Sequence, residues 1–319
     1  MLGLVGDIGG TNARFALAED AGGRPVVREP RGYANKDHDG LEGAIDAYLE
    51  ELGAPRPAKV ILAVAGPVTG GATRFTNSSW VVSEERLKSV GGFKAARLLN
   101  DFAAQALGAP RVASEDLVRL GPDVQTPAAG TLAILGPGTG FGVAGLVREF
   151  GVEVVLSTEG GHAGFAPSDE VEVEIWRRLA RNRTRISVER VLSGTGLHEL
   201  YQALGDIEGL AAPLPDARSV QQACEAGDPL ARQTVDRFCR ILGSAAGDIA
   251  LTLGARGGVY VTGGVAEKLA VELQKSAFRE RFEAKGRFVD YMRAIPTWLV
   301  MDPYAALIGA ASQLAALEA

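Results

Sequence analysis

The chain has 319 residues, of which 46% are hydrophobic, with 41 glycines, 15 prolines and two cysteines. Average usage of ~7% glycine would give roughly 22, and glycine is used where the backbone bends sharply or lies close to a ligand, so the excess indicates several such places. The net charge of -6 argues against a nucleic-acid or anionic-membrane partner held by bulk charge, and the hydrophobic content argues against a disordered chain.

The N-terminus is predicted to be a β-hairpin that carries the first glycine turn. Leu2–Asp7 reads as an apolar strand, Ile8–Asn12 as the turn and Ala13–Ala18 as the second strand. Asn100 and Asp101 follow a later strand directly and precede a short helix. The elements predicted in between are an amphipathic helix over Leu41–Gly53, a buried strand over Lys59–Ala65, a helix capped by Ser83 and a strand over Ala96–Leu99.

A domain boundary is expected in the segment 109–130, where the pattern loosens into connections that carry proline and glycine. Residues 1–110 together with 301–319 are expected to form a small α/β domain, and residues 111–300 a large one. A chain of this length usually divides into about two domains, each with its own core.

The second half begins with another strand, turn and strand, and is then mostly helical. A long helix is predicted to begin at Asp228-Pro229, and Cys239 lies on its apolar stripe, so we interpret this cysteine as a core residue. The segments Leu4–Leu17 and Ala133–Leu146 share one plan, which predicts two similar domain cores. The predicted strands are Thr131–Leu135, Phe141–Arg148, Val152–Leu156, Gly258–Val261 and Trp298–Met301, with Gly136–Gly140 as a turn and Ala305–Leu314 as the last helix.

The glycine turns are candidates for phosphate binding, because their N–H groups point into the turn and the missing Cβ lets oxygens approach. None carries the lysine of a G-x-x-x-x-G-K-[ST] loop, and the His-Arg-Asp and Asp-Phe-Gly triplets of protein kinases do not occur. Gly140–Gly145 matches G-x-G-x-x-G but continues as a strand, whereas a dinucleotide site needs a helix there. A pair of phosphate-holding turns, one per domain and closing on a nucleotide, remains.

Six segments resemble, in chain order, the motifs of the bacterial glucokinases in the actin/hexokinase/Hsp70 superfamily. Two are similar to phosphate loops, three to sugar-binding segments and one, VTGG, to the adenosine motif. The segments are Leu4–Phe15 and Gly136–Gly140 for phosphate, Leu98–Phe102, Glu159–His162 and Glu189–Gly194 for sugar, and Val261–Gly264 for adenosine. With two cysteines the chain lacks the Cys-rich zinc motif of the related repressor/ORF/kinase sugar kinases, so it resembles the zinc-free glucokinase branch.

The resemblance implies an α/β chain with the two-domain actin-like ATPase (ribonuclease H-like) fold and the active site in the interdomain cleft. It implies ATP-dependent phosphorylation of D-glucose to glucose 6-phosphate, with Asp101 as the base. Taken alone, Asp101 is equally well explained as a helix N-cap, and Glu189 as a first-turn acid after Ser187. The residues implied to bind the sugar are Asn100, Asp101, Gly138, Glu159, His162 and Glu189.

The resemblance also implies ATP and Mg²⁺ as cofactors. Asp7 is expected to face Mg²⁺, which prefers one or two carboxylates plus substrate phosphates. Thr76–Trp80 lies where the family has a loop near the sugar. The residues implied to contact the nucleotide are Gly6, Asp7, Ile8, Gly9, Gly10, Thr11, Asn12, Gly138, Thr139, Gly263 and Gly264.

The expected partners are the small molecules glucose and ATP, with no nucleic acid and no membrane, and the resemblance implies a homodimer. No signal peptide and no apolar stretch of about eighteen residues is found in the sequence, so we expect a cytoplasmic protein. Three alternatives stay open: a kinase for another hexose or an N-acetylhexosamine, a sugar-sensing regulator that is not an enzyme, and a filament- or chaperone-type ATPase. The choice among ATP, ADP and polyphosphate as phosphate donor also stays open.

Overall fold

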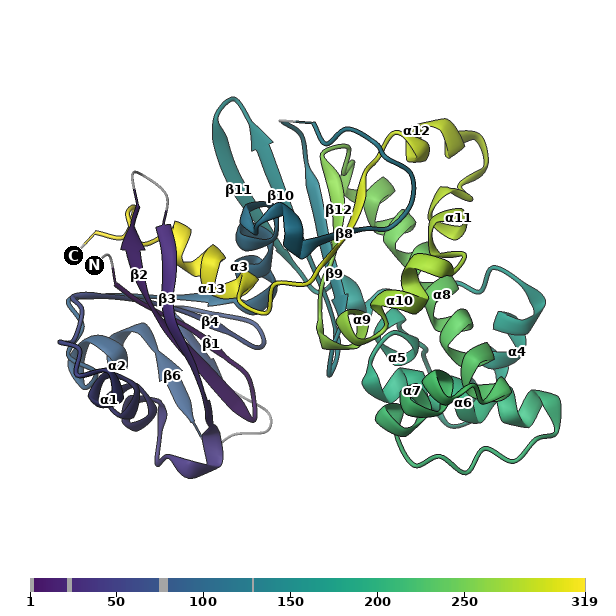
Figure 1. Ribbon diagram of the computed structural model, residues 1–319, viewed down its shortest axis with the longest axis horizontal. Helices are drawn as coiled ribbons and strands as arrows, with labels where there is room; N and C mark the ends of the chain where they lie inside the picture. The colour runs from purple at the N-terminus through teal and green to yellow at the C-terminus, as the bar shows by residue number, and fades with distance from the viewer. Residues whose placement is uncertain (1–2, 22–24, 75–79, 128, 319) are drawn as a thin grey trace. The chain divides into compact units, whose positions relative to one another are not determined.

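The computed structural model describes residues 3–21, 25–74, 80–127 and 129–318 (Figure 1). The chain divides into two compact units, each with its own sheet. Unit 1 comprises Met1–Ala113 and Asp302–Ala319, and unit 2 comprises Ser114–Met301.

Unit 1 contains a five-stranded sheet in the order β3-β2-β1-β4-β7. Strands β1, β2 and β3 are antiparallel neighbours, which confirms the predicted N-terminal hairpin, whereas β1, β4 and β7 run parallel to one another. A separate pair, β5 and β6, is antiparallel. The strands are β1 (Gly3–Ile8), β2 (Asn12–Asp20), β3 (Pro25–Ala34), β4 (Lys59–Val64), β5 (Ala72–Arg74), β6 (Val81–Ser83) and β7 (Ala95–Asn100).

The helices of unit 1 begin and end close to the predicted positions. Ser83 caps α2 by accepting a hydrogen bond from the Arg86 N–H, and α1 ends at Gly53 in the left-handed conformation that favours glycine. Helix α13, from the end of the chain, packs with β1 and β3 of this unit as well as with α3. The helices are α1 (Leu41–Leu52), α2 (Glu84–Ser89), α3 (Asp101–Gly108) and α13 (Ala305–Ser312), with the 3-10 turns η1 (Asn35–Asp37) and η2 (Ala109–Arg111).

Two glycines let α3, the helix that begins at Asp101, pack closely against α13. A Cβ on Gly309 would overlap the backbone oxygen of Ala104, and a Cβ on Gly108 would overlap that of Ala305. Because both neighbours are backbone atoms, neither can move aside as a flexible side chain would. The position of α3 therefore depends on two small residues 201 positions apart in the sequence (309 minus 108).

We expect Gly309→Ala to destabilise the protein by about 1–3 kcal/mol, because the added methyl forces α13 away from α3. Gly43→Ala is the matched control, since Gly43 lies inside helix α1 with no atom within 4 Å of an added Cβ. That substitution should stabilise by about 0.5–1 kcal/mol, as glycine-to-alanine changes do in open helices. Thermal unfolding of the two variants would test this, and equal midpoints would contradict it.

Unit 2 contains a six-stranded sheet in the order β11-β10-β9-β12-β13-β8. Strands β9, β10 and β11 are antiparallel neighbours, and β9, β12 and β13 are parallel. The strand order and directions of β3-β2-β1-β4-β7 are thus repeated in β11-β10-β9-β12-β13, which confirms the predicted duplicated plan of strand, turn and strand. The strands are β8 (Leu117–Arg119), β9 (Leu132–Pro137), β10 (Phe141–Glu149), β11 (Val152–Thr158), β12 (Gly258–Val261) and β13 (Thr297–Val300).

Two predictions about connections need correction. Gly136 and Pro137 are not in a turn: they pair with Gly142 and Phe141 of β10, so the turn is limited to residues 138–140. The segment 109–130 is not uniformly irregular either, because it contains η2, η3 (Ser114–Asp116) and β8, which pairs with β13. A short strand at a sheet edge has too few residues to give a periodic signal.

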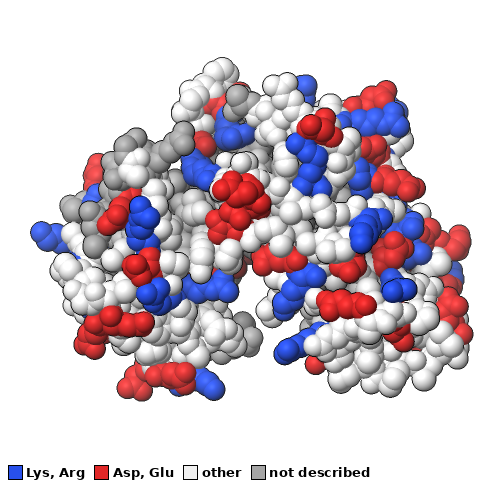
Figure 2. All heavy atoms as spheres, in the orientation of Figure 1, with Lys and Arg blue, Asp and Glu red and all other residues white. Residues whose placement is uncertain are grey.

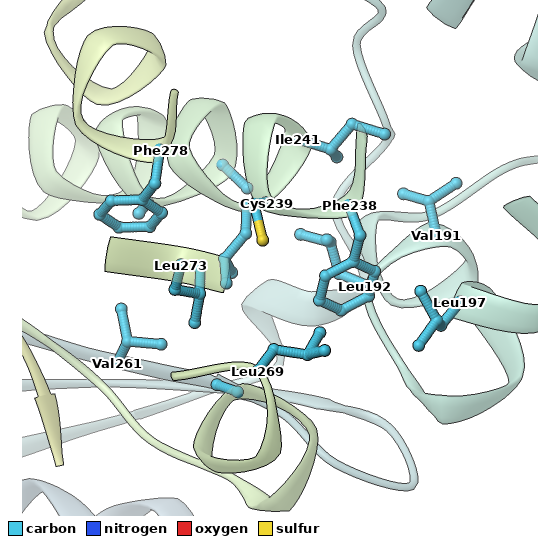
Figure 3. Close-up of a cluster of buried hydrophobic side chains, with 14 of the residues drawn as sticks. Val191, Leu192, Leu197, Phe238, Cys239, Ile241, Val261, Leu269, Leu273 and Phe278 are labelled. Carbon is cyan, nitrogen blue, oxygen red and sulfur yellow. The ribbon is translucent and has the colours of Figure 1, made fainter. Parts of the chain in front are cut away.

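The core of unit 2 is built around the long helix α8 (Pro229–Leu253), capped by Asp228 as predicted. Phe238, Cys239 and Ile241 of α8 are buried against side chains of the smaller helices and of β12 (Figure 3). Burial raises the pKa of the Cys239 thiol, in line with its prediction as a core residue. The other helices are α4 (Glu170–Leu179), α5 (Val188–Val191), α6 (Gly194–Glu208), α7 (Ala217–Ala226), α9 (Gly264–Lys268), α10 (Ala270–Lys275), α11 (Phe278–Glu283) and α12 (Val289–Arg293), with the 3-10 turns η4 (Gly160–His162), η5 (Ala180–Asn182) and η6 (Gly286–Phe288).

The surface carries charges of both signs. On the face shown in Figure 2, acidic and basic side chains are intermixed over each unit. Across the described residues, none of the helices has both the length and the apolar character needed to span a membrane.

Candidate active site

In unit 1, the predicted site residues lie at one edge of the sheet. Strands β1, β4 and β7 are parallel, so their carboxyl ends lie at the same edge, with Asp7 near the end of β1 and Asn100 at the end of β7. The segment after β4 connects the two: the Ala65 N–H donates to Ile8 O, and Asn100 Nδ2 donates to Gly66 O at 3.1 Å. Residues 93 positions apart (100 minus 7) are thereby brought to one edge.

The first phosphate turn joins β1 to β2. The Gly9 N–H donates to Asn12 O at 2.9 Å, so it is engaged within the turn. In the part of the chain that the structure describes, the N–H groups of Gly10 and Thr11 have no protein acceptor. Two N–H donors are therefore available to an anion at this turn, as phosphate binding requires.

Two residues predicted to contact the nucleotide, Gly6 and Ile8, are buried inside β1. A Cβ on Gly6 would meet the side chains of Leu62 and Phe15, so this glycine is required by packing against β4 and β2. Ile8 has no exposed surface. Neither residue presents a side chain at the turn, and their contribution is to position Asp7 and Gly9.

Asp7 is the carboxylate closest to this turn along the chain. Its side chain is 28% exposed, and Arg14 Nη1 lies 4.0 Å from its Oδ2. Burial raises the pKa of Asp7 above its usual value, while the positive charge of Arg14 acts in the opposite direction. Among the described residues, no group of three or more His, Cys, Asp or Glu is arranged to hold a metal ion. Asp7 is thus the residue at this turn that could hold a Mg²⁺ ion arriving with its phosphates.

Asn100, rather than Asp101, is the N-cap of α3. Asn100 Oδ1 accepts hydrogen bonds from the N–H groups of Phe102 and Ala103, at 3.0 and 3.1 Å. Asp101 is the first residue of the helix, and its Oδ1 accepts from the Phe102 N–H at 2.9 Å. The explanation of Asp101 as an N-cap is therefore wrong.

In unit 2, the second phosphate turn lies against the adenosine segment. A Cβ on Gly136 would overlap Thr262 O, and Gly263, whose φ is +95°, has its Cβ position 2.6 Å from Pro137 O. The other side of the turn contacts the start of α6, where the Gly194 N–H donates to Gly138 O at 2.9 Å. Thr139 is exposed at the tip. Gly138, Thr139, Gly263 and the exposed Gly264 are thus grouped within one unit.

The Glu159–His162 segment forms the 3-10 turn η4, packed on strand β10. A Cβ on Gly161 would overlap Phe141 O, and one on Gly160 would lie 3.0 Å from the Val143 side chain. The two glycines are therefore needed for close approach to the strand. Their φ values are not positive, so a left-handed conformation is not the reason for them.

Glu189 joins this group from helix α5. Its Oε2 accepts a hydrogen bond from the Phe141 N–H at 2.9 Å, and a Cβ on Gly140 would overlap the same oxygen. Ser187 caps α5, so Glu189 is also a first-turn acid, as the alternative explanation proposed. The two explanations are compatible, because the carboxylate has a second oxygen, Oε1, that lies 3.9 Å from His162 Nδ1.

Glu159, His162 and Glu189 form a polar cluster, which we call the acid–imidazole cluster. His162 lies between the two carboxylates, with Nε2 4.0 Å from Glu159 Oε2. The three side chains are 65%, 60% and 34% exposed in that order, so their polar atoms are accessible. Acceptors and an imidazole at this spacing suit a ligand with several neighbouring hydroxyl groups.

A cavity of about 250 Å³ in unit 2 is lined in part by Gly160 and Val188, which adjoin Glu159 and Glu189 in the sequence. Its walls are mostly aliphatic, from Val143, Val188, Ile241, Ile249 and Leu253, and the three side chains of the acid–imidazole cluster are not part of its lining. A sugar needs hydrogen-bonding partners on most of its edges. We therefore place the candidate sugar contacts at the exposed cluster and not in the cavity.

Two residues at the first phosphate turn were not predicted from the sequence. Arg14 lies near Asp7, and Asn35 Nδ2 donates to Gly9 O at 2.9 Å. Asn35 is 26 residues from Gly9 and carries no local motif, so only the pairing of β2 with β3 could have indicated it. Of the predicted loop Thr76–Trp80, residues 76–79 lie outside the described residues.

Comparisons with known proteins agree on one family. The family model described as Glucokinase matches residues 4–317. The glucokinase of Caulobacter sp. (strain K31) is 54% identical over 310 residues, which are 97% of this chain and 94% of that protein. The crystal structure of a glucokinase from an Antarctic psychrotroph has a TM-score of 0.89 and 37% identity, and covers 98% of both chains.

A more distant structure extends the similarity of fold. A ROK family glucokinase from Streptomyces griseus, crystallised in complex with glucose and AMPPNP, has a TM-score of 0.65 at 18% identity and covers 97% of both chains. The chain thus has the mixed α/β fold of the ROK and glucokinase class of sugar kinases.

Proposed function

This chain belongs to the glucokinase family, and on that premise we propose that it transfers the γ-phosphoryl group of ATP to the 6-hydroxyl of D-glucose, with Asp101 as the base. The observation that carries the assignment of Asp101 is its place at the start of α3, at the sheet edge that also holds Asp7 and the first phosphate turn.

Asp101 suits this reaction through orientation rather than strong basicity. Phosphoryl transfer passes through a loose transition state, so the attacking hydroxyl has to be aimed more than it has to be deprotonated early. A carboxylate has several lone-pair sites on its two oxygens, so it can accept from a hydroxyl while it also accepts from a backbone N–H. Asn100, whose Oδ1 caps the helix, has a second Nδ2 hydrogen with which to contact the sugar.

We infer that the two phosphate turns hold ATP, with Gly10, Thr11 and Asn12 on one side and Gly138 and Thr139 on the other. Asp7 would hold Mg²⁺, which neutralises charge on the phosphates when it is bound. The uncommitted N–H groups of the first turn and the place of Asp7 near the end of β1 support this assignment. Gly263 and Gly264 would leave backbone open to the adenosine.

We place the sugar against Asn100 and Asp101 of unit 1 and Gly138 and the acid–imidazole cluster of unit 2. This requires residues of both units to act on one substrate pair, as in the two-domain actin-like fold with its active site between the domains. The proposal includes a homodimer in the cytoplasm, by resemblance to the glucokinase family. The intermixed surface charges and the net charge of -6 support small molecules, rather than nucleic acid or membrane, as partners.

A substrate panel in a coupled ADP assay tests the function. Glucose should give kcat/KM at least about tenfold above that of fructose, mannose and N-acetylmannosamine, because each competitor misplaces or lacks a hydroxyl that a polar site would bind. An assay of glucose 6-phosphate formation with ATP, ADP or polyphosphate supplied in turn identifies the phosphate donor. A higher kcat/KM for another sugar would reassign the substrate, and ATP hydrolysis at a similar rate without sugar would favour an ATPase.

A further inference from the structure

The peptide between Gly9 and Gly10 is the part of the first phosphate turn most free to rotate. Two adjacent glycines have no Cβ to restrict their backbone angles, so the peptide plane can flip at little steric cost. In a trans peptide the C=O of one residue and the N–H of the next point in opposite directions. The direction of Gly9 O therefore decides where the Gly10 N–H points.

Asn35 holds this peptide in one orientation. Its Nδ2 donates to Gly9 O at 2.9 Å, which directs the Gly10 N–H away from Asn35. Its backbone N–H donates to Thr11 O at 2.9 Å, next to the last β2–β3 pair, Asn12 with Ala34. Only the first bond depends on the side chain, so the asparagine has a role beyond that of the sheet.

The position of Asn35 is itself well determined. The residue is 6% exposed, and its backbone oxygen accepts from the His38 N–H in turn η1. The His38 ring lies edge-on to Tyr33 at 5.5 Å, and Tyr33 OH donates to Glu51 Oε2 at 2.6 Å. The amide orientation is also defined, because exchanging its N and O would place two oxygens against each other at Gly9 O.

The Asn35 side chain donates to Gly9 O but leaves its own acceptor oxygen without a hydrogen bond from the described residues. Its Oδ1 is buried and has no protein partner among the described residues. An unpaired buried acceptor is unfavourable, so packing alone would favour an apolar side chain here. We infer from the amide at this position that its donor, and not its bulk, is what the site requires.

We propose that Asn35 is a positioning residue for the nucleotide, which keeps the Gly9–Gly10 peptide in the orientation that presents the Gly10 N–H to a phosphate. This inference rests on the proposed function, in which the first turn binds ATP. With the peptide flipped, the turn presents the Gly9 carbonyl instead, and a carbonyl oxygen repels an anionic phosphate.

The test is calorimetric titration of the full chain with AMPPNP and Mg²⁺, with steady-state kinetics in glucose. Asn35→Ala should raise the Kd for AMPPNP about five- to tenfold, the value of one orienting hydrogen bond, and leave the KM for glucose unchanged. Asn35→Asp should raise the Kd further, since the isosteric carboxylate places an oxygen against Gly9 O. Asn35→Leu, which keeps bulk without a donor, should match Asn35→Ala.

Two further variants keep the interpretation unambiguous. Asn182→Ala makes the same change at an exposed asparagine in η5 and should leave the Kd unchanged. Gly10→Val places a branched side chain in the turn itself and should abolish binding. If Gly10→Val binds AMPPNP normally, the assignment of this turn to phosphate is wrong. The positioning role is wrong if Gly10→Val fails to bind while the Asn35 variants bind like the wild type. It is also wrong if the Asn35 variants raise the KM for glucose by the same factor as the Kd for AMPPNP.

Discussion

Asp101→Ala is expected to lower sugar-dependent ADP production by about 10²- to 10⁴-fold while nucleotide binding persists. The substitution removes the acceptor that orients the attacking hydroxyl and leaves the phosphate turns intact. Asn100 caps α3 through its own side chain, so the helix keeps its cap without the Asp101 carboxylate. The expected loss is therefore in kcat and not in folding, and kcat together with the Kd for AMPPNP would be measured on the same preparation.

The matched control for this test is Asp290→Ala. The side chain of Asp290 is 89% exposed and forms a surface ion pair with Arg293. This control should retain wild-type turnover. Asp101→Asn adds a second comparison, because an amide keeps the shape and one acceptor but cannot take the proton. If Asp101→Ala turns over at close to the wild-type rate, another group orients the hydroxyl.

Local signals in the sequence predicted most of the elements around the site. The hairpin β1–β2, the capped helix α2 and the long helix α8 each depend on neighbouring residues, so their periodicity and caps sufficed. The prediction failed where pairing overrides local preference. The dipeptide Gly136-Pro137 is typical of a turn. Pro137 is nevertheless the last residue of β9, where its missing N–H costs little, and both residues pair with β10.

The site was predictable only where a motif carries it. Asp101, the phosphate turns and the acid–imidazole cluster lie in segments that resemble glucokinase motifs. Arg14 lies in such a segment but was given no role, and Asn35 lies outside all six segments. Both reach the turn through strand register: Arg14 pairs with Asp7 across β1 and β2, and Asn35 follows Ala34, the partner of Asn12. Register is a property of the assembled sheet. A contact that depends on register therefore cannot be inferred from how far apart two residues are in the sequence.

A second large effect is expected at Glu172, a carboxylate with no exposed surface in unit 2. Its Oε1 lies 2.7 Å from Arg281 and 3.2 Å from Arg237, and its Oε2 accepts from the Ser168 N–H at 2.8 Å. Asp169 pairs with the same two arginines. The negative charges of the two carboxylates thus balance the positive charges of the two guanidinium groups. These ion pairs connect α4 with α8 and α11.

Glu172→Ala should destabilise the protein by about 3–5 kcal/mol, because it removes the fully buried carboxylate and leaves two arginines, 16% and 12% exposed, with one partly exposed carboxylate. Glu174→Ala is the control on the same helix: Glu174 is 40% exposed and paired with Arg177 and Arg178, so its loss should leave the urea midpoint nearly unchanged. The urea midpoint measures both, and hydrogen exchange in α8 places the loss in unit 2. Equal midpoints for the two variants would show that the cluster contributes no more than a surface pair.

The pH dependence of stability follows from Asp169 in the same cluster. Loss of hydration acts to raise its pKa, but hydrogen bonds from the Glu172 N–H, Arg237 and Arg281 outweigh it, so the pKa lies below the usual 3.8. A carboxyl with a lowered folded pKa adds stability that is fully present above its unfolded pKa and is lost as the pH falls through the folded value. The urea midpoint of the wild type should therefore keep this contribution at neutral pH and lose it below about pH 4, and Asp169→Asn should remove that part of the acid dependence. An acid profile that is identical in the wild type and Asp169→Asn would mean that the arginines are stabilised by Glu172 alone.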